Sequence, residues 1–272
     1  MFKRMLVLSA ACVMLFVVLC GCTSQEKKAA IQSYNDAVAA LEAKNTQLDA
    51  HIEAAQALVT AAEPALDVST LSALERAVSA AKEGKVPVPD AMPETVEEIL
   101  AVTRDTLGAV DYSEAETALS DAKTAYETSV RQLQQLTNPE ETFVIERLQK
   151  VEGVTGVEAV TEENDPNGML GKQGGYTAQV YFTFDQVNAA SVNGKSIIEK
   201  GTDGGGSLEV YETAAEAEAR NTYLGSFDGT MFASGSHHVY GTVLVRTSNL
   251  LTASQQKALE DRIVESLAAI AD

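Results

Sequence analysis

The chain has 272 residues, of which 39 are Asp or Glu and 20 are Lys or Arg, so its formal net charge is −19 at pH 7. A chain this acidic is repelled by phosphate backbones and by anionic headgroups, which argues against nucleic-acid binding and against binding to anionic lipid surfaces. Apolar residues make up 45% of the sequence, which is enough to build ordinary hydrophobic cores in one or two domains.

The N-terminal stretch has a basic start, Lys3 and Arg4, and then an uncharged apolar run over residues 5–19. This arrangement is typical of a secretory signal peptide. The run ends in Leu19-Cys20-Gly21-Cys22, which resembles the lipobox of bacterial lipoproteins. The resemblance implies cleavage before Cys22 and attachment of a diacylglyceryl group to that residue. We therefore expect a signal peptide over residues 1–21 and a polar tether over 22–30.

An uncleaved transmembrane anchor is the alternative interpretation of the same stretch. Its apolar run is about 15 residues long, near or below the ~17–25 that a membrane-spanning helix needs. Polar residues follow Cys22 at once, which favours lipidation at Cys22. The expected location is the extracytoplasmic side of the cell membrane, with the membrane as one partner and an envelope protein as a further candidate. Cys12 and Cys20 would leave with the signal peptide, so we expect no cofactor and no metal site built on thiolates.

Residues 31–137 have the composition of long helices and are predicted to form a helical bundle. A first helix over about 25–62 carries a heptad pattern, and a polar Asn45 occupies one of its core positions. The other core positions of that heptad are Ile31, Tyr34, Val38, Leu41, Leu48, Ile52, Ala55, Val59 and Ala62.

Further helices are predicted over about 69–83, from Pro93 to 107, and from Ser113 to 136, where Ser113 and Glu116 match a capping box. Short links between such helices favour an antiparallel bundle with three legs, which could act as a stalk or bind a partner. A parallel coiled-coil dimer is the alternative.

Residues 138–272 change from a helical to a strand period and are predicted to form an α+β domain. Asn138 as N-cap and Pro139 at the first position predict a helix that ends near Gly153. Strands are expected over about 154–160, 176–184, 207–211 and 239–246, with a long loop over 185–206. Thr213 and Thr252 each begin a capping box, which predicts helices over 213–224 and 252–271. This order predicts a ferredoxin-like α+β sandwich, with a mostly antiparallel sheet and the helices on one face.

The second half also resembles a domain of uncharacterised envelope lipoproteins of Gram-positive bacteria. The resemblance covers about half of the chain and implies no particular activity. The segments that carry it are Lys172–Ala178, Lys200–Gly206, Glu209–Tyr211, Arg220-Asn221, Tyr223-Leu224, Ser234–His237, Gly241–Val243 and Val245–Ser248.

Two short motifs invite a functional reading and have a simpler structural one. Glu163-x-Asp165-x-Asn167-Gly168 matches the start of a calcium loop, but its twelfth position is Gly174 in place of the bidentate Glu, so a solvated turn is favoured. Gly201–Gly206 could hold an anion in a backbone nest, although close chain approach at a strand is the favoured reason for these glycines.

Asp203 and His237 are the candidate ligand-binding residues of the second half. They belong to Gly-rich or polar segments, Lys200–Gly206 and Ser234–His238, which together with Lys172–Gly175 would form a surface if two of them met. We expect a lipid-anchored envelope protein with a binding or scaffolding role rather than an enzyme. The alternative is an extracytoplasmic enzyme or metal-binding protein that uses Asp203, Ser236 and His237, although no nucleophile elbow surrounds Ser236.

Overall fold

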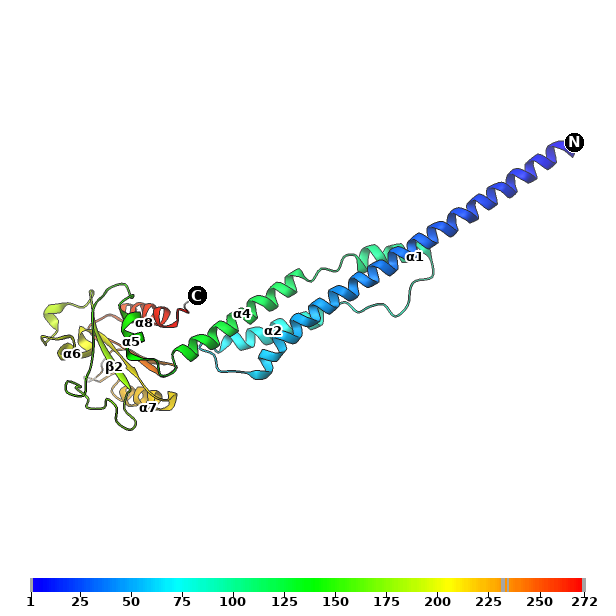
Figure 1. Ribbon diagram of the computed structural model, residues 1–272. Helices are drawn as coiled ribbons and strands as arrows, with labels where there is room; N and C mark the ends of the chain where they lie inside the picture. Colours follow the sequence, from blue (N-terminus) through cyan, green and yellow to red (C-terminus); the bar gives the residue numbers. More distant parts are fainter. Residues whose placement is uncertain (1, 231–232, 234, 271–272) are drawn as a thin grey trace. The chain divides into compact units, whose positions relative to one another are not determined.

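The computed structural model describes residues 2–230, 233 and 235–270, with side chains described from Ser24 onward. Within these residues the chain forms eight α-helices and one five-stranded antiparallel sheet, so the predicted α+β class is confirmed (Figure 1). The chain divides into two compact units. The first comprises residues up to Ala62 together with Leu71–Thr124, and the second comprises Glu63–Thr70 together with Ala125 onward. The boundary expected at residue 138 falls inside the second unit.

The first elements along the chain are helical: α1 (Phe2–Ala61), α2 (Ser69–Gly84), α3 (Val96–Ala101), the π-helical turn η1 (Val102–Leu107) and α4 (Ser113–Gln135). They end near the expected positions, but α1 begins at Phe2, well before the expected residue 25, and the expected third helix is divided into α3 and the π-helical turn. The expected tether, residues 22–30, is part of α1. The side chains of Leu19 to Cys22 lie outside the described residues. Among the helices that the structure describes, none combines the length and the apolar character required to cross a bilayer.

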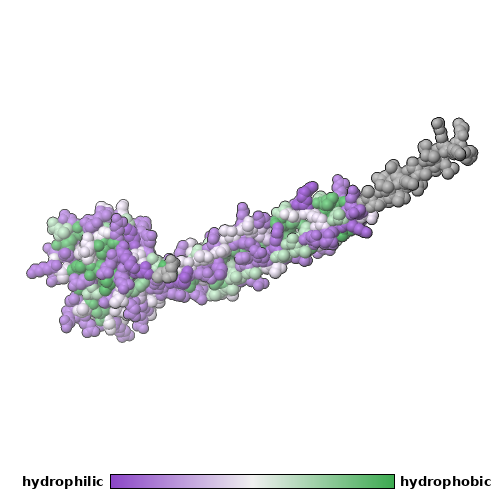
Figure 2. Space-filling view, turned by 45° about the horizontal axis from the view of Figure 1, so that its top comes forward, coloured by the Kyte–Doolittle hydropathy of each residue, from purple (hydrophilic) through white to green (hydrophobic). Residues whose placement is uncertain are grey.

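The first unit is helical, and its three legs are α1, the segment from α2 to η1 and the start of α4. The second leg runs antiparallel to α1, because Lys82 Nζ donates to Gln56 Oε1 at 2.7 Å and, further along, Lys85 Nζ donates to Asp49 Oδ1 at 2.7 Å. The expected heptad face of α1 is buried at most positions: Tyr34, Leu41, Asn45, Leu48, Ile52 and Ala55. Figure 2 shows hydrophilic side chains over much of the outer surface of this unit, as expected of helices that bury their apolar face against one another.

Asn45 joins all three legs through hydrogen bonds within the chain. Its Nδ2 donates to the main-chain oxygen of Val86 at 3.0 Å, and its Oδ1 accepts from the hydroxyl of Tyr112 at 2.8 Å. The same hydroxyl accepts from the main-chain N–H of Val86 at 2.8 Å. The buried amide therefore fixes the extended segment that follows α2, and it finds its partners without a second chain.

The second unit consists of a five-stranded sheet with helices around it. Its elements are α5 (Glu141–Leu148), β1 (Val154–Ala159), β2 (Ala178–Phe184), η2 (Ala189–Ser191), α6 (Ile197–Lys200), η3 (Gly201–Gly204), β3 (Gly205–Val210), α7 (Ala214–Gly225), β4 (His237–Tyr240), β5 (Val243–Thr247) and α8 (Ala253–Ala268). The strand order is β1-β2-β3-β5-β4, and every neighbouring pair is antiparallel. The central strand is therefore β3.

Helices cover both faces of this sheet, so the expectation of helices on one face is wrong. Val180 and Phe182 of β2 pack in a core with residues of α5 and α8. Tyr181, between them, packs on the opposite face with residues of α6 and α7. Figure 1 shows α8 and α7 on opposite sides of β2. Both residue phases of the inner strands are therefore buried, as in a sheet covered on two sides.

The segment expected as one strand over 239–246 is instead the β4–β5 hairpin. Tyr240 pairs with Val243, so Gly241 and Thr242 form a two-residue turn. Gly241 has φ of +64°, the positive value that the first central position of a type II′ turn requires. The turn is held by the chain after α4, because the N–H of Thr242 donates to the main-chain oxygen of Leu136 at 3.0 Å.

Two other local predictions differ from the structure. Asn138 does not cap α5: it has φ of +46°, and its side chain accepts a hydrogen bond from Thr177, so the helix begins only at Glu141. The segment 185–206 is not a plain loop, since it contains η2, α6 and η3. Ser196 and Glu199 form a capping box at the start of α6, a signal that the sequence carried.

Candidate functional site

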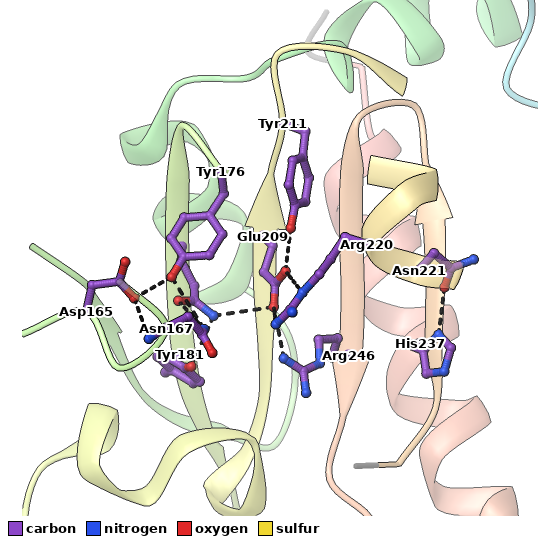
Figure 3. A network of polar contacts seen from close by, with 11 residues as sticks. Asp165, Asn167, Tyr176, Tyr181, Glu209, Tyr211, Arg220, Asn221, His237 and Arg246 are labelled. Atoms are coloured by element: carbon purple, nitrogen blue, oxygen red, sulfur yellow. Dashed lines mark hydrogen bonds and ion pairs between the residues drawn. The ribbon is translucent and has the colours of Figure 1, made fainter. Parts of the chain in front are cut away.

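Glu209 lies near the C-terminal end of the central strand β3, on the sheet face that α7 covers, and its side chain is fully buried. Its carboxylate accepts from Arg246 Nη1 at 2.9 Å, from Arg220 Nε at 3.0 Å and from the hydroxyl of Tyr211 at 2.7 Å. Gln179 Nε2 lies 3.5 Å from the same group. A buried carboxylate requires such partners, because an unpaired charge is strongly unfavourable away from water. Figure 3 shows these side chains converging on Glu209.

The charge state of this cluster follows from its geometry. Burial by itself raises the pKa of Glu209, but the attraction of Arg246 and Arg220 and the hydrogen bonds from Arg220 and Tyr211 outweigh it, so the pKa lies below its ordinary value. For Tyr211, burial and then the negative charge of Glu209 raise the pKa. The cluster therefore holds an ionised carboxylate and a neutral phenol, and Tyr211 acts as a hydrogen-bond donor.

A polar loop that precedes β2 in the chain extends the cluster. Asp165 accepts from the hydroxyl of Tyr176 and from the main-chain N–H groups of Asn167, Met169 and Leu170. These bonds confirm the turn predicted at Asp165–Gly168 and leave the carboxylate of Asp165 occupied by the protein, which favours the solvated-turn interpretation over a calcium loop. The ring of Tyr176 meets the ring of Tyr211 edge-on, with centroids 6.3 Å apart. The loop is thus fixed against the end of β3.

A cavity of about 470 Å³ opens between this loop and α7. We call it the Arg220 pocket, and its lining residues are Asn167, Met169, Gly174, Tyr176, Tyr211, Glu216, Ala219, Arg220 and Tyr223. Met169 and Tyr223, which are 38% and 55% exposed, both stand on the pocket wall. The lining therefore combines apolar and aromatic side chains with a few polar groups such as Asn167 and Arg220, the combination that small-molecule sites use.

Arg220 connects the pocket to the buried cluster. Its Nε and Nη2 atoms point to Glu209, at 3.0 and 3.4 Å, and its guanidinium carbon lies 5.3 Å from the ring centre of Tyr223. The side chain is 21% exposed. Among the residues that the structure describes, Nη1 of Arg220 has no hydrogen-bond partner. One edge of the guanidinium thus binds Glu209, and the same side chain lines the pocket.

The three side chains of the alternative enzyme hypothesis are each engaged elsewhere. His237 is 10% exposed, and its Nδ1 contacts Asn221 Oδ1 at 2.6 Å (Figure 3), while its Nε2 contacts Asp228 Oδ1 at 3.3 Å. Ser236 Oγ bonds with Thr247 Oγ1 at 2.6 Å and donates to Glu260. Asp203 is exposed, and its main-chain oxygen accepts a hydrogen bond from Ser248 Oγ at 3.0 Å. These contacts do not place the imidazole between a serine and an aspartate.

Two of the three segments singled out in the sequence do lie at one end of the sheet. The N–H of Thr247 donates to the oxygen of Ser236, and the next residue, Ser248, bonds Asp203 and Gly205. The third segment, Lys172–Gly175, precedes β2 at the opposite end and contributes Gly174 to the Arg220 pocket. Close packing accounts for Gly206: a Cβ there would lie 2.2 Å from the main-chain oxygen of Arg246.

The sequence carries one signal for the Arg220 pocket. Glu209 places a charge between Leu208 and Val210 in a predicted strand, and a charge that is buried there demands partners of opposite charge. Tyr176, Tyr211, Arg220 and Tyr223 belong to the segments on which the resemblance to envelope lipoproteins rests. No sequence pattern predicts that these side chains converge on Glu209, because Arg220 comes from α7 and Arg246 from β5. Within the described residues, no three His, Cys, Asp or Glu side chains gather as metal ligands.

No family model, curated protein or solved structure matches the chain at the significance searched. The lipobox-like sequence and the chemistry of the Arg220 pocket therefore remain as the grounds for a function.

Proposed function

We propose that the chain is a lipoprotein, anchored through Cys22 to the cell membrane on its extracytoplasmic side, whose second unit binds a small ligand in the Arg220 pocket. In this proposal the helical unit serves as the stalk and its heptad face packs in coiled-coil fashion within the chain. The observation that carries the binding role is the pocket itself, where Met169 and Tyr223 offer exposed apolar surface beside the free edge of Arg220.

Binding rather than catalysis is favoured by how the polar groups are used. The carboxylate of Glu209 and the phenol of Tyr211 satisfy each other inside the protein. Such saturated networks give rigidity, and a rigid pocket binds its ligand with a smaller loss of conformational entropy. Occupation of the pocket by a small molecule, whatever its charge, is what this part of the proposal requires.

For the fold, we propose that the second unit resembles ferredoxin-like sandwiches in one motif. The segment β3-α7-β4 crosses over with β5 inserted between the two strands, and the antiparallel pairing of β5 with each makes β3 and β4 parallel to each other. This is a split β-α-β unit, which ferredoxin-like sandwiches contain. The all-antiparallel run β1-β2-β3 extends it on one side.

The anchor is tested by the substitution Cys22→Ser in cells fed with labelled palmitate. The expected result is a precursor that is neither cleaved nor labelled, because the thiol that accepts the diacylglyceryl group is gone. The matched control is Cys20→Ser, which changes a neighbouring thiol and should leave labelling intact. Normal processing, palmitate labelling and membrane retention of the Cys22→Ser chain would overturn the anchor.

A further inference from the structure

We infer that the Arg220 pocket selects a ligand with a single carboxylate joined to an apolar or aromatic group; this inference rests on the proposed binding function and goes beyond it by naming the ligand class. Three features of the pocket lead to it: the geometry of Arg220, the surface offered by the rim, and the placement of the acidic neighbours.

The guanidinium of Arg220 is oriented before any ligand arrives. Its Nε and Nη2 atoms are held by the fully buried Glu209, which in turn is held by Arg246. A guanidinium is planar, with its donors in a fixed fork, so binding one edge to Glu209 also sets the direction of the other edge. That second edge presents parallel donors, the arrangement that matches the two oxygens of a carboxylate.

The rim explains the apolar part of the ligand. Tyr223, 55% exposed, is supported by an edge-on contact with Phe227, with ring centroids 5.2 Å apart, and by Arg220 beside its ring. Met169, 38% exposed, lies on the loop side of the same cavity. A thioether and a phenol ring offer adaptable apolar contact to a flat or aliphatic group. A ligand anchored on Arg220 would cover both side chains.

The acidic neighbours limit the ligand to one negative charge. Glu216 lines the pocket one helical turn before Arg220, and its Oε2 accepts from the N–H and hydroxyl of Thr213. Asp165, on the loop, is held by Tyr176 and by main-chain N–H groups. A second anionic group on the ligand would be repelled by these two carboxylates.

The test compares two probes of the same shape on the full chain in detergent: 3-phenylpropanoate and its neutral amide, 3-phenylpropanamide. We expect the acid to bind roughly tenfold more tightly than the amide, because a charge-assisted bidentate contact is about twice as strong as a neutral one. Ligand-observed NMR titration gives both dissociation constants. Equal affinities for the two probes would overturn the inference while leaving the pocket as a binding site, whereas binding of neither probe would overturn the inference and remove the support for the proposed binding function.

Substitutions test whether the preference for the acid over the amide arises in the Arg220 pocket. Arg220→Gln should abolish the difference between acid and amide, and Arg104→Gln, which removes the same charge from a site that is 76% exposed in the other unit, should leave it unchanged. Because Arg220→Gln also takes a partner from Glu209, Tyr223→Ala provides a second variant that leaves the buried cluster intact. This variant should bind both probes several-fold more weakly and should still prefer the acid to the amide. If the Tyr223→Ala variant binds both probes as tightly as the wild type does, the placement of the ligand against Tyr223 is overturned.

Discussion

At the scale of single residues, Glu209 determines the character of the sheet face that α7 covers. An apolar residue at this central strand position would need no partners, whereas the carboxylate requires Arg220, Arg246 and Tyr211 around it. Replacing a buried ion pair by well-packed apolar residues is often neutral or stabilising, so the cluster is poorly explained by stability alone. Its clearest consequence is the fixed direction of Arg220 at the pocket.

The substitution Glu209→Gln is expected to lower the free energy of unfolding by about 3–5 kcal/mol, because it leaves the buried guanidinium of Arg246 and the partly buried one of Arg220 without their carboxylate. Urea unfolding followed by circular dichroism measures the change. Ser207→Ala is the matched control: it lies on the same strand face, and its buried hydroxyl has no hydrogen-bond partner among the described residues. Removing such a group should leave stability unchanged or slightly raised. Equal losses for the two variants would contradict the role given to the charge.

The same measurement repeated against pH checks the charge state of Glu209. Its pKa is lower in the folded chain than in the unfolded chain, so protonation favours unfolding. The stability that it contributes is therefore complete above the unfolded-state pKa of about 4.3 and is lost as the pH falls through the lower folded-state value. The difference in the free energy of unfolding between the wild type and the Glu209→Gln variant should therefore become smaller only in that acidic range. A difference that stays constant down to strongly acidic pH would contradict the lowered pKa, because it would mean that folding does not change how tightly Glu209 binds its proton.

At the scale of secondary-structure elements, local signals predicted the helices well and missed the hairpin. Thr213 and Thr252 form the capping boxes that the sequence predicts, because a cap depends only on residues three positions apart. The alternation through Val239 and Val243 predicted one continuous strand. In the structure Val239 packs on the α7 face and Val243 on the α8 face, since the turn between them reverses the chain. A period of two does not distinguish these cases, and the Gly-Thr pair was the only local sign.

Gly241 offers a test of that hairpin. Its φ is +64°, and a Cβ would lie 2.5 Å from the main-chain oxygen of Leu136. Gly241→Ala should therefore combine backbone strain with a steric clash. Gly171→Ala is the matched control, because Gly171 has φ of +66° but nothing within 4 Å of its added Cβ. We expect a loss of about 1–2 kcal/mol for Gly171→Ala from strain alone. The loss for Gly241→Ala should exceed this by about 1–3 kcal/mol, and thermal unfolding of both variants checks it. Similar losses would mean that the turn can move away from Leu136.

At the scale of the whole molecule, the sequence indicates two parts, and the predicted boundary between them rests on a local helix-start signal. Asn138 and Pro139 look like the beginning of a new domain, and the expected division followed them. In the structure the second unit already includes the end of α4 from Ala125, together with Glu63–Thr70. Ser129 of α4 accepts from the N–H groups of Leu66 and Asp67 within this unit. Such contacts are long-range in sequence, so composition and period carry no sign of them.

Leu136 shows why the end of α4 belongs to the second unit. It is fully buried in the core between α5, α8 and the sheet, and its main-chain oxygen accepts from the N–H of Thr242. Just before it, Gln135 Nε2 donates to the main-chain oxygen of Leu267 at 2.6 Å, at the end of α8. A fragment that starts at Asn138 would expose core surface and lose both bonds.

We therefore expect a fragment of residues 125–272 to be more stable than one of residues 138–272. Removal of a buried leucine alone costs about 2–5 kcal/mol, and the lost hydrogen bonds add to this. Residues 63–70 are missing from both fragments, so their absence cancels in the comparison. Urea unfolding followed by circular dichroism gives the two free energies, and Leu136→Ala in the longer fragment separates the core contribution from the rest. If the two fragments unfold at the same urea concentration, α4 contributes nothing to the second unit, and the domain begins at Asn138 as its start signal suggests.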